Sequence, residues 1–321
     1  CESRRAPLCS GMATVPLMAA ACVSTTFVGG FILAFIEGWQ LTLVLCAMAL
    51  LRTGVRWKAQ SIIVTMSETE ADFFVLAHEP GHDQEALPLW ASAREGLIHF
   101  DEAPAPVERI DLPDLPGVFQ LHNVLSSEEC EQFRLIVDTL GFHDDAPVSL
   151  PHSVRHMRNL NWLVDESICG TLFSRCQPQL TELIGGAPSL GLNARFRFYR
   201  YQPGDYFKTH TDGSWPGSAV VDGKLQVDAF GDRWSQLTFL LLLSGDYDGG
   251  HTRFYPEGES GEAIPVHTPL GSALCFPHGG HPQHYPHAGE KIRRGVKYII
   301  RTDVLYGRTP GSEKFQRRWM Y

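Results

Sequence analysis

The stretch that decides the fold runs from Arg195 to Asp212 and reads RFRFYRYQPGDYFKTHTD. Its first half alternates aromatic and charged residues, which is typical of a β-strand with two different faces. Its second half ends in His210-Thr211-Asp212, and side chains two residues apart in an extended chain point to the same side. An imidazole and a carboxylate on one side supply two of the three ligands of a facial triad for non-haem Fe(II). Taken alone, this pair fits a surface turn better than a metal site.

A third metal ligand and a cation lie far along the chain. The segment 276–306 reads FPHGGHPQHYPHAGEKIRRGVKYIIRTDVLY. It contains His287, which could complete the triad, and Lys297, which follows ten residues later in a strand-like run. A cation one hairpin away from a metal-binding His could pair with the distal carboxylate of a dicarboxylate that chelates the metal. Three further histidines crowd the segment, and we expect loop positions for them: His278, His281 and His284.

The order and spacing of these residues resemble the 2-oxoglutarate- and Fe(II)-dependent dioxygenases, and within them the prolyl 4-hydroxylase catalytic-domain type. The resemblance extends from Leu112 to Tyr306. It is carried by separate points along the chain: Tyr201, Gly204, His210-x-Asp212, Gly249-Gly250-x-Thr252, His287-x-Gly289, Gly295-x-Lys297 and Arg301-Thr302-Asp303. Family members often have Glu where this chain has Ala288, a position that is not a ligand.

The resemblance implies a catalytic site and its cofactors. Three residues would be catalytic and would hold Fe(II), and three others would contact 2-oxoglutarate. The implied iron ligands are His210, Asp212 and His287, and the implied 2-oxoglutarate contacts are Lys297, at the distal carboxylate, with Tyr201 and Thr252 as helpers. O2 would be the other co-substrate, and L-ascorbate would keep the iron reduced. Tyr201 also fits an ordinary packing tyrosine. For Arg301 we favour a structural ion pair, with Asp303 or a neighbour, over a second anion contact.

The implied reaction is hydroxylation of an unactivated C–H bond, with peptidyl proline as the first candidate substrate. An alternative keeps the chemistry but changes the substrate to a small molecule or another protein side chain, since a fold does not determine a function. An alternative of another class is a membrane-tethered jelly-roll binding protein with an idle metal site. The intact triad and the lysine argue against it.

The composition excludes several other functions. The net charge of −9 argues against non-specific nucleic-acid binding. The eight cysteines are scattered, and none forms a C-x-x-C pair with the spacing of a zinc site. They do not decide the redox compartment. The chain also has no GxxxxGK[ST] phosphate-binding loop.

Residues 1–65 differ in character from the rest of the chain. An apolar run covers Val15–Ile36, long enough for a membrane span, and a second follows at Leu41–Leu51. The stretch Phe27–Leu45 is similar to a transmembrane helix of multidrug-type ABC exporters. The segment is therefore either a membrane anchor or a piece of an unrelated gene fused to a chain that starts near Met66; because the sequence begins at Cys1, we favour the fusion. A genuine segment would make the protein membrane-associated, and otherwise a soluble cytoplasmic protein is expected.

Residues 66–111 are acidic and rich in proline, which predicts a linker with irregular structure. They contain His78-Glu79-Pro80-Gly81-His82, which matches the HExxH zinc motif. That motif requires both histidines on one helical face, and Pro80 and Gly81 would break the helix. We therefore do not expect a zinc protease.

The range 112–309 is expected to form the catalytic domain, followed by a tail at 310–321. A capping box at Ser126 predicts a helix to about Leu140, and Asp165 predicts a second helix to Ile184. Many short strands with turn signals predict a mainly β fold, a double-stranded β-helix or jelly roll with supporting helices. Residues 143–162 fit either a solvated loop or a substrate entrance. The long insert 213–232 is expected to be a lid or substrate loop.

Overall fold

The computed structural model describes residues 72–147 and 151–308. In these ranges no helix is long and apolar enough to cross a membrane. The apolar segment, its exporter-like stretch and the tail at 310–321 lie outside the described residues. The structure therefore concerns the part of the chain in which the catalytic motifs occur.

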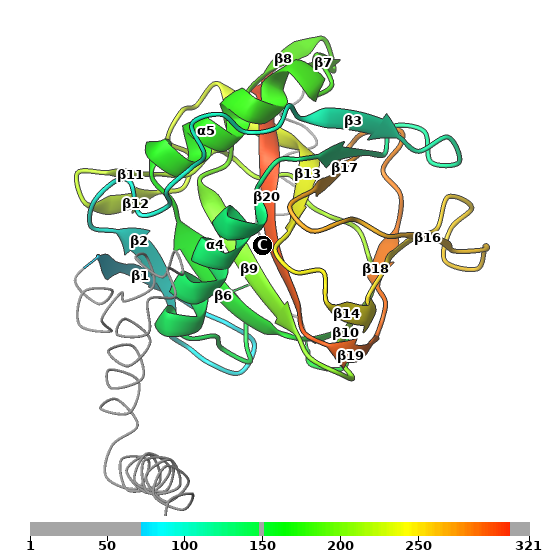
Figure 1. The fold of residues 1–321 in the computed structure, drawn as a ribbon, viewed down its shortest axis with the longest axis horizontal. Helices are drawn as coiled ribbons and strands as arrows, with labels where there is room; N and C mark the ends of the chain where they lie inside the picture. Colours follow the sequence, from blue (N-terminus) through cyan, green and yellow to red (C-terminus); the bar gives the residue numbers. More distant parts are fainter. Residues whose placement is uncertain (1–71, 148–150, 309–321) are drawn as a thin grey trace, which may run out of the picture. The chain divides into compact units, whose positions relative to one another are not determined.

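The larger of two main sheets has eleven strands within the described ranges. Its main path runs β1-β2-β6-β9-β20-β13-β17-β4-β3, while β8 pairs with β20 and β7 with β8 (Figure 1). The strands are β1 (Phe73–Glu79), β2 (Leu87–Ser92), β3 (Glu108–Asp111), β4 (Phe119–His122), β6 (Arg158–Leu163), β7 (Leu183–Ile184), β8 (Ala187–Leu192), β9 (Arg195–Tyr201), β13 (Arg233–Leu242), β17 (Ala273–Pro277) and β20 (Lys297–Gly307).

The smaller main sheet has the order β16-β15-β18-β10-β5, and two further pairs are β11-β12 and β14-β19. The strands are β5 (Arg155–His156), β10 (Tyr206–His210), β11 (Ala219–Val221), β12 (Lys224–Gln226), β14 (Tyr247–Gly249), β15 (Thr252–Phe254), β16 (Ile264–Val266), β18 (His287–Gly289) and β19 (Ile292–Gly295). Residues of both main sheets line one cavity. The prediction of a mainly β fold with few helices is confirmed, and the arrangement is consistent with a jelly roll.

Two helices cover one face of the larger sheet (Figure 1). Helix α4 (Ser127–Leu140) begins at the predicted capping box, in which Ser126 and Glu129 each bond the other's backbone N–H. Helix α5 (Glu166–Cys176) begins after Asp165 as predicted but ends earlier than Ile184. A 3-10 turn, η1 (Gln177–Gln179), follows and contains Pro178, which lacks the N–H that an α-helix needs at this point. The predicted helix was therefore about two turns too long.

The core lies between these helices and the sheet. Phe133 of α4 packs against Trp162 and Phe198, with ring centroids 6.2 and 6.1 Å away. Phe196 and Phe198 are fully buried on this side, as the alternation of β9 predicts. The other face of β9, including Arg197 and Tyr201, lines the cavity. One strand thus serves the core with one face and the candidate site with the other.

The prediction of an irregular linker over 66–111 is wrong for its described part. β1 and β2 form a hairpin there, and β2 extends the large sheet by parallel pairing with β6. Leu87, Leu89 and Ala91 are buried at every second position, a strand signal that the neighbouring prolines obscured. Residues 143–162 likewise contain β5 and β6 rather than loop alone.

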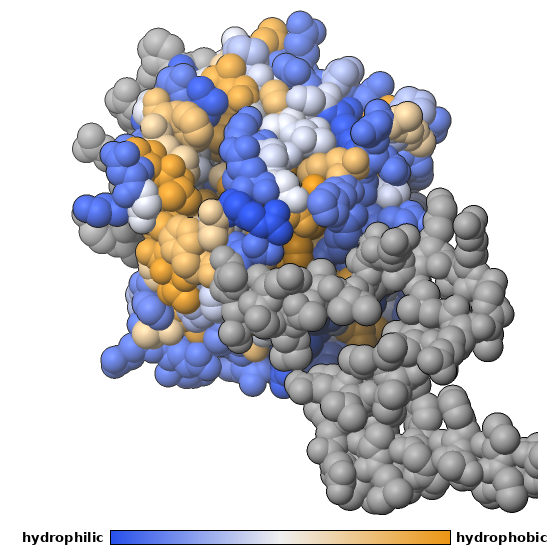
Figure 2. Space-filling model, turned by 60° about the vertical axis from the view of Figure 1, so that its left-hand side comes forward, coloured by the Kyte–Doolittle hydropathy of each residue, from blue (hydrophilic) through white to orange (hydrophobic). Residues whose placement is uncertain are grey.

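The HExxH match has no helix to support it. His78 and Glu79 are the last residues of β1, and His82 lies beyond the strand. The Glu79 carboxylate instead accepts hydrogen bonds of 2.8 and 2.7 Å from the Arg195 guanidinium. Glu79 thus ties β1 to β9. On the side of the molecule that carries β1 and the β11–β12 hairpin, hydrophobic and hydrophilic residues alternate over the surface (Figure 2).

A substitution of Phe73 tests whether β1 contributes to the stability of the domain. Its ring is 6% exposed and meets Trp162 edge-on at 5.1 Å. We expect Phe73→Ala to lower the free energy of unfolding by about 3–5 kcal/mol, because a cavity is left beside the core. Phe74 is 38% exposed, and Phe74→Ala should change it by less than about 0.5 kcal/mol. Denaturant unfolding measures both, and equal, small effects would mean that β1 does not stabilise the domain.

Candidate active site

A cavity of about 690 Å³ lies between the two main sheets. The six site residues expected from the sequence all line it: Tyr201, His210, Asp212, Thr252, His287 and Lys297. They come from β9, β10, β15, β18, β20 and the segment after β10. Residues up to 96 positions apart are therefore brought to one space by the pairing of short strands.

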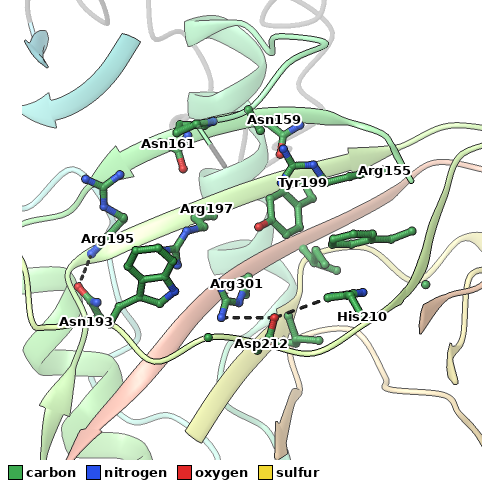
Figure 3. A pocket seen from close by; sticks show the side chains of 18 of the residues that line it. Arg155, Asn159, Asn161, Asn193, Arg195, Arg197, Tyr199, His210, Asp212 and Arg301 are labelled. Carbon is green, nitrogen blue, oxygen red and sulfur yellow. Dashed lines mark hydrogen bonds and ion pairs between the residues drawn. The ribbon is translucent and has the colours of Figure 1, made fainter. Parts of the chain in front are cut away.

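His210, Asp212 and His287 form a compact group at the wall of this cavity. His210 ends β10 and pairs with His287, the first residue of β18. The Nε2 atoms of His210 and His287 each lie 3.8 Å from an oxygen of Asp212. All three ligand atoms lie within 4.8 Å of one another, a spacing that could hold a metal ion. Asp212 stands beyond the end of β10, yet its carboxylate still turns toward His210 (Figure 3).

Hydrogen bonds orient both imidazoles for metal binding. His210 Nδ1 lies 2.8 Å from the backbone oxygen of Lys208, and His287 Nδ1 lies 3.2 Å from that of Tyr285. A carbonyl oxygen can only accept, so a neutral ring must carry its proton on Nδ1 and leave the Nε2 lone pair free. In addition, the Phe207 ring stacks on His210 at 3.7 Å. Both rings thus present Nε2 to the shared centre.

The ionisation of the three groups also suits a metal. Burial lowers the pKa of His210, and burial together with the neighbouring His210 lowers that of His287 to about 3. Burial alone would raise the pKa of Asp212, but the charge of Arg301 and the nearby imidazoles hold it well below its usual range. Two neutral imidazoles and one carboxylate are the forms that bind a divalent cation. The donor set therefore fits Fe(II).

The Asp212 carboxylate is fixed by a chain of hydrogen bonds. The Thr238 hydroxyl donates to Asp212 Oδ2 at 2.7 Å. Since that proton is used, Thr238 must accept from His278 Nδ1, also at 2.7 Å. His278 Nε2 can then accept from the Ser235 hydroxyl at 2.9 Å, and the Trp215 backbone N–H donates to Ser235 at 2.8 Å. Every donor in the chain has one acceptor, so the direction of each bond is determined.

His278 lies in the loop directly after β17, as predicted, but it is not a solvated loop residue. Its side chain is fully buried, and burial lowers its pKa to about 4, which keeps the ring neutral. The burial of His278 and its two hydrogen bonds could not be predicted from the sequence, because Ser235 and Thr238 fall on opposite faces of a regular strand. A β-bulge between Ser235 and Leu237 shifts the alternation and lets both hydroxyls reach His278.

Lys297 lies buried at another part of the cavity, directly opposite Tyr201 in the β9–β20 pairing. Its ammonium donates to the Gly250 backbone oxygen at 2.5 Å, and burial lowers its pKa to about 8. An ammonium has three donors, so two are available to a ligand carboxylate. Gly250 has φ +68, and a Cβ there would lie 2.3 Å from Ile292 Cδ1. Glycine thus lets the backbone approach this lysine.

Arg301 faces the cavity and contacts two carboxylates. Its guanidinium donates to Asp303 at 3.1 Å, which is the ion pair favoured from the sequence. It also lies 3.5 Å from Asp212 Oδ1, a contact that the sequence did not predict (Figure 3). Burial alone would lower the pKa of Arg301, but Asp212 and Asp303 raise it above its usual value. Arg301 therefore neutralises the carboxylate of the candidate ligand Asp212 on the side away from Thr238.

The two segments considered as possible substrate contacts both reach the cavity. Arg155 and Asn159 line it from 143–162, whereas Trp162 belongs to the core. The insert 213–232 contains the β11–β12 hairpin, and its first part lines the cavity through Trp215 and Pro216. Asn193 holds that part by donating to the Pro216 backbone oxygen at 3.1 Å. Asn161, Asn193 and Arg197 were not singled out from the sequence, because sequence alone does not show which polar residues share a cavity.

Comparison with known proteins agrees with this geometry. Residues 196–302 match the profile of the 2OG-Fe(II) oxygenase superfamily. Among curated protein sequences, none matches the chain significantly.

Several solved structures match the chain at low identity. A prolyl-4-hydroxylase of Pseudomonas putida has 15% identity over 61% of this chain and 94% of its own, with a TM-score of 0.38. The viral collagen prolyl hydroxylase of Paramecium Bursaria Chlorella virus-1, in a 2OG complex, has 17% identity over 61% and 99%, with a TM-score of 0.40. A Trichoplax adhaerens prolyl hydroxylase, in complex with a hypoxia inducible factor peptide fragment, has 19% identity over 60% and 84%, with a TM-score of 0.42. These values do not indicate a substrate.

The profile match and the His-Asp-His group together define the class of protein. The described domain is that of a 2-oxoglutarate-dependent dioxygenase, which uses Fe(II) and 2-oxoglutarate. The comparisons give no support to the resemblance to ABC exporters.

Thr238 should set the strength of metal binding. Thr238→Val keeps the shape of the side chain but removes the donor to Asp212, and such losses around a metal site weaken affinity by about 10–100-fold. Thr238→Ser retains the hydroxyl and should bind Fe(II) within about threefold of the unchanged protein. Anaerobic Fe(II) titration measures both, with circular dichroism as the check on folding. Unchanged affinity in a folded Thr238→Val protein would contradict the expectation.

His278 should make the stability of the metal-free protein depend on pH. The unfolded chain takes up a proton near pH 6.5, whereas the folded chain does so only near its pKa of about 4. The free energy of unfolding should therefore fall as pH falls from 6.5 to 4, by about 3 kcal/mol from this residue. In His278→Gln this share of the slope should disappear. Urea unfolding at pH 7 and pH 4 tests it, with the exposed His99→Gln as control; parallel slopes in all three proteins would contradict it.

Proposed function

We propose that this protein is an Fe(II)- and 2-oxoglutarate-dependent hydroxylase of the prolyl 4-hydroxylase type. His210, Asp212 and His287 would hold the iron, and Lys297 would bind the distal carboxylate of 2-oxoglutarate. One observation supports the proposal most strongly: two imidazoles with free Nε2 atoms, an ionised carboxylate and a buried lysine share one cavity. L-Ascorbate is proposed as the reductant that keeps the iron ferrous.

Fe(II) and 2-oxoglutarate, when bound, supply the oxygen activation that hydroxylates an unactivated C–H bond. The protein's own residues position these groups and neutralise charge. Thr238 and Arg301 hold the two oxygens of Asp212 from opposite sides, so the carboxylate cannot rotate freely. Lys297 offers two donors to the co-substrate carboxylate. Tyr201 lies beside Lys297 in the sheet, and Thr252 lies opposite Gly289, two residues from His287. Both would assist in binding 2-oxoglutarate.

The substrate is the less specific part of the proposal. The sequence resemblance favours a proline within a peptide, whereas the buried polar lining of the cavity suits a small polar molecule equally well. A binding protein with an idle metal site would have no need of the buried, partly unpaired lysine, because a buried cation is costly unless it has a counter-charge.

Succinate formation tests the proposal. The full chain with Fe(II), 2-oxoglutarate, ascorbate and O2 should form succinate, and His210→Ala should abolish it by removing a metal ligand. Lys297→Met should raise the KM for 2-oxoglutarate by about tenfold or more, because a charged hydrogen-bond partner is lost.

A proline-rich peptide added to the same assay separates the substrates. Stimulation by the peptide would support prolyl hydroxylation, and succinate formation without stimulation would favour the small-molecule alternative. A folded protein that binds iron but forms no succinate under either condition would contradict the enzyme and favour the binding protein.

A further inference from the structure

Arg197 is a buried cation on the cavity wall that the proposed reaction does not use. Its residue surface is 9% exposed, and Nη1 is fully buried without a hydrogen-bond partner in the described part of the chain. The ion-pair contact of Nη1 is Asp303 Oδ2 at 3.6 Å, beyond ordinary hydrogen-bond length. The other oxygen of that carboxylate already accepts from Arg301 at 3.1 Å. One carboxylate is thus shared by two arginines.

The position of Arg197 is electrostatically unfavourable. It lies directly opposite Arg301 in the β9–β20 pairing, and like charges at such positions destabilise a sheet. Arg301 has a second carboxylate, Asp212, whereas Asp303 is the only carboxylate within ion-pair distance of Arg197 among the described residues. Burial and the adjacent Arg301 lower the pKa of Arg197 to about 10, so it is still charged at neutral pH. Arg197 thus keeps its charge beside a single, shared carboxylate 3.6 Å away, and an anionic ligand would supply a second partner.

The side chains around Arg197 suit a carboxylate. Asn161 lies opposite it on β6 and is 6% exposed on the cavity wall. Asn159, two residues along the same strand, has a buried Oδ1 without a partner among the described residues. The Trp215 ring lies 5.8 Å from the guanidinium. A guanidinium fork beside amide groups and an aromatic face can bind a planar carboxylate through two parallel hydrogen bonds.

This cation is separate from the one assigned to 2-oxoglutarate. Lys297 pairs with Tyr201, and Arg197 pairs with Arg301, four residues further along both strands. Four residues of a strand span about 13 Å. A carboxylate of 2-oxoglutarate held by Lys297 therefore does not reach Arg197. Arg301 lies opposite Arg197 and contacts Asp212, and all three residues line the same cavity.

We propose that the substrate is a small carboxylic acid whose carboxylate binds Arg197, with Asn161 and Trp215 beside it. This inference rests on the proposed function and specifies its substrate class. It favours a free or N-acylated acid over a proline inside a polypeptide, since an internal proline carries no carboxylate.

Binding of matched acids and amides tests the inference without turnover. The full chain is loaded with Fe(II) and 2-oxoglutarate under nitrogen and titrated in a calorimeter with N-acetyl amino acids and their amides, N-acetyl-L-proline and N-acetyl-L-prolinamide among them. At least one acid should bind about tenfold or more tightly than its amide, and Arg197→Gln should abolish that preference. Arg200→Gln is the matched control: Arg200 lies on the same strand and pairs with Asp138 at 3.2 Å outside the cavity. It should retain the preference.

Two outcomes of the titration would overturn the inference: no acid that binds better than its amide, or a preference that persists in Arg197→Gln. Thermal unfolding gives a second reading. If the role of Arg197 were only to stabilise Asp303 by an ion pair, Arg197→Gln would have a clearly lower Tm than the unchanged protein. If Arg197 is a ligand-binding cation, we expect the Tm of Arg197→Gln to be equal or higher. Before any acid is added, the binding of iron and 2-oxoglutarate is monitored by the charge-transfer absorption of the bound pair. Failure to load would count against the proposed function, while the Tm comparison would still decide the role of Arg197.

Discussion

The site depends on one buried carboxylate being held in a single orientation. Asp212 has an arginine at one oxygen and a threonine hydroxyl at the other, and the two imidazoles face it from the adjoining strands. A buried carboxylate without such partners would take up a proton and lose its value as a ligand. Arg301 keeps it charged, and Thr238 keeps it oriented. The large sheet supplies both, since β20 carries the arginine and β13 the threonine.

The two faces of β9 and β20 have different roles, and this difference explains how the fold supports the position of Asp212. One face of each strand packs against α4 and α5, where Phe133, Trp162 and Phe198 interlock. The opposite face carries arginines, tyrosines and a lysine that would be too costly to bury in a core. The packing of one face against the helices thus stabilises the sheet, and the sheet holds the polar side chains of its other face in the cavity wall. Polar side chains positioned in this way are available to ligands.

The predictability of the site from the sequence follows the same physics. The resemblance to the dioxygenases implied that His210, Asp212, His287 and Lys297 share one site, and all four line one cavity. The alternation in β9 by itself predicted only a strand with two different faces, because periodicity is a local signal. The hydrogen-bond chain through His278 was missed, since a β-bulge in β13 changes which hydroxyls share a face. The strands β1 and β2 were missed because proline and acidic residues obscured a short alternating run. Arg197 was not singled out, because the missing hydrogen bond of its Nη1 atom is a property of the packed structure alone.

The hydrogen-bond chain that ends at Asp212 begins at the backbone of Trp215, in the insert that lines the cavity. The cavity wall and the metal ligand are therefore linked thermodynamically. If ordering of the Trp215 segment strengthens metal binding through Asp212, then metal binding orders the Trp215 segment. The coupling free energy is the same in both directions. A molecule that rests against Trp215 is thus coupled to the metal site without touching any ligand of the metal.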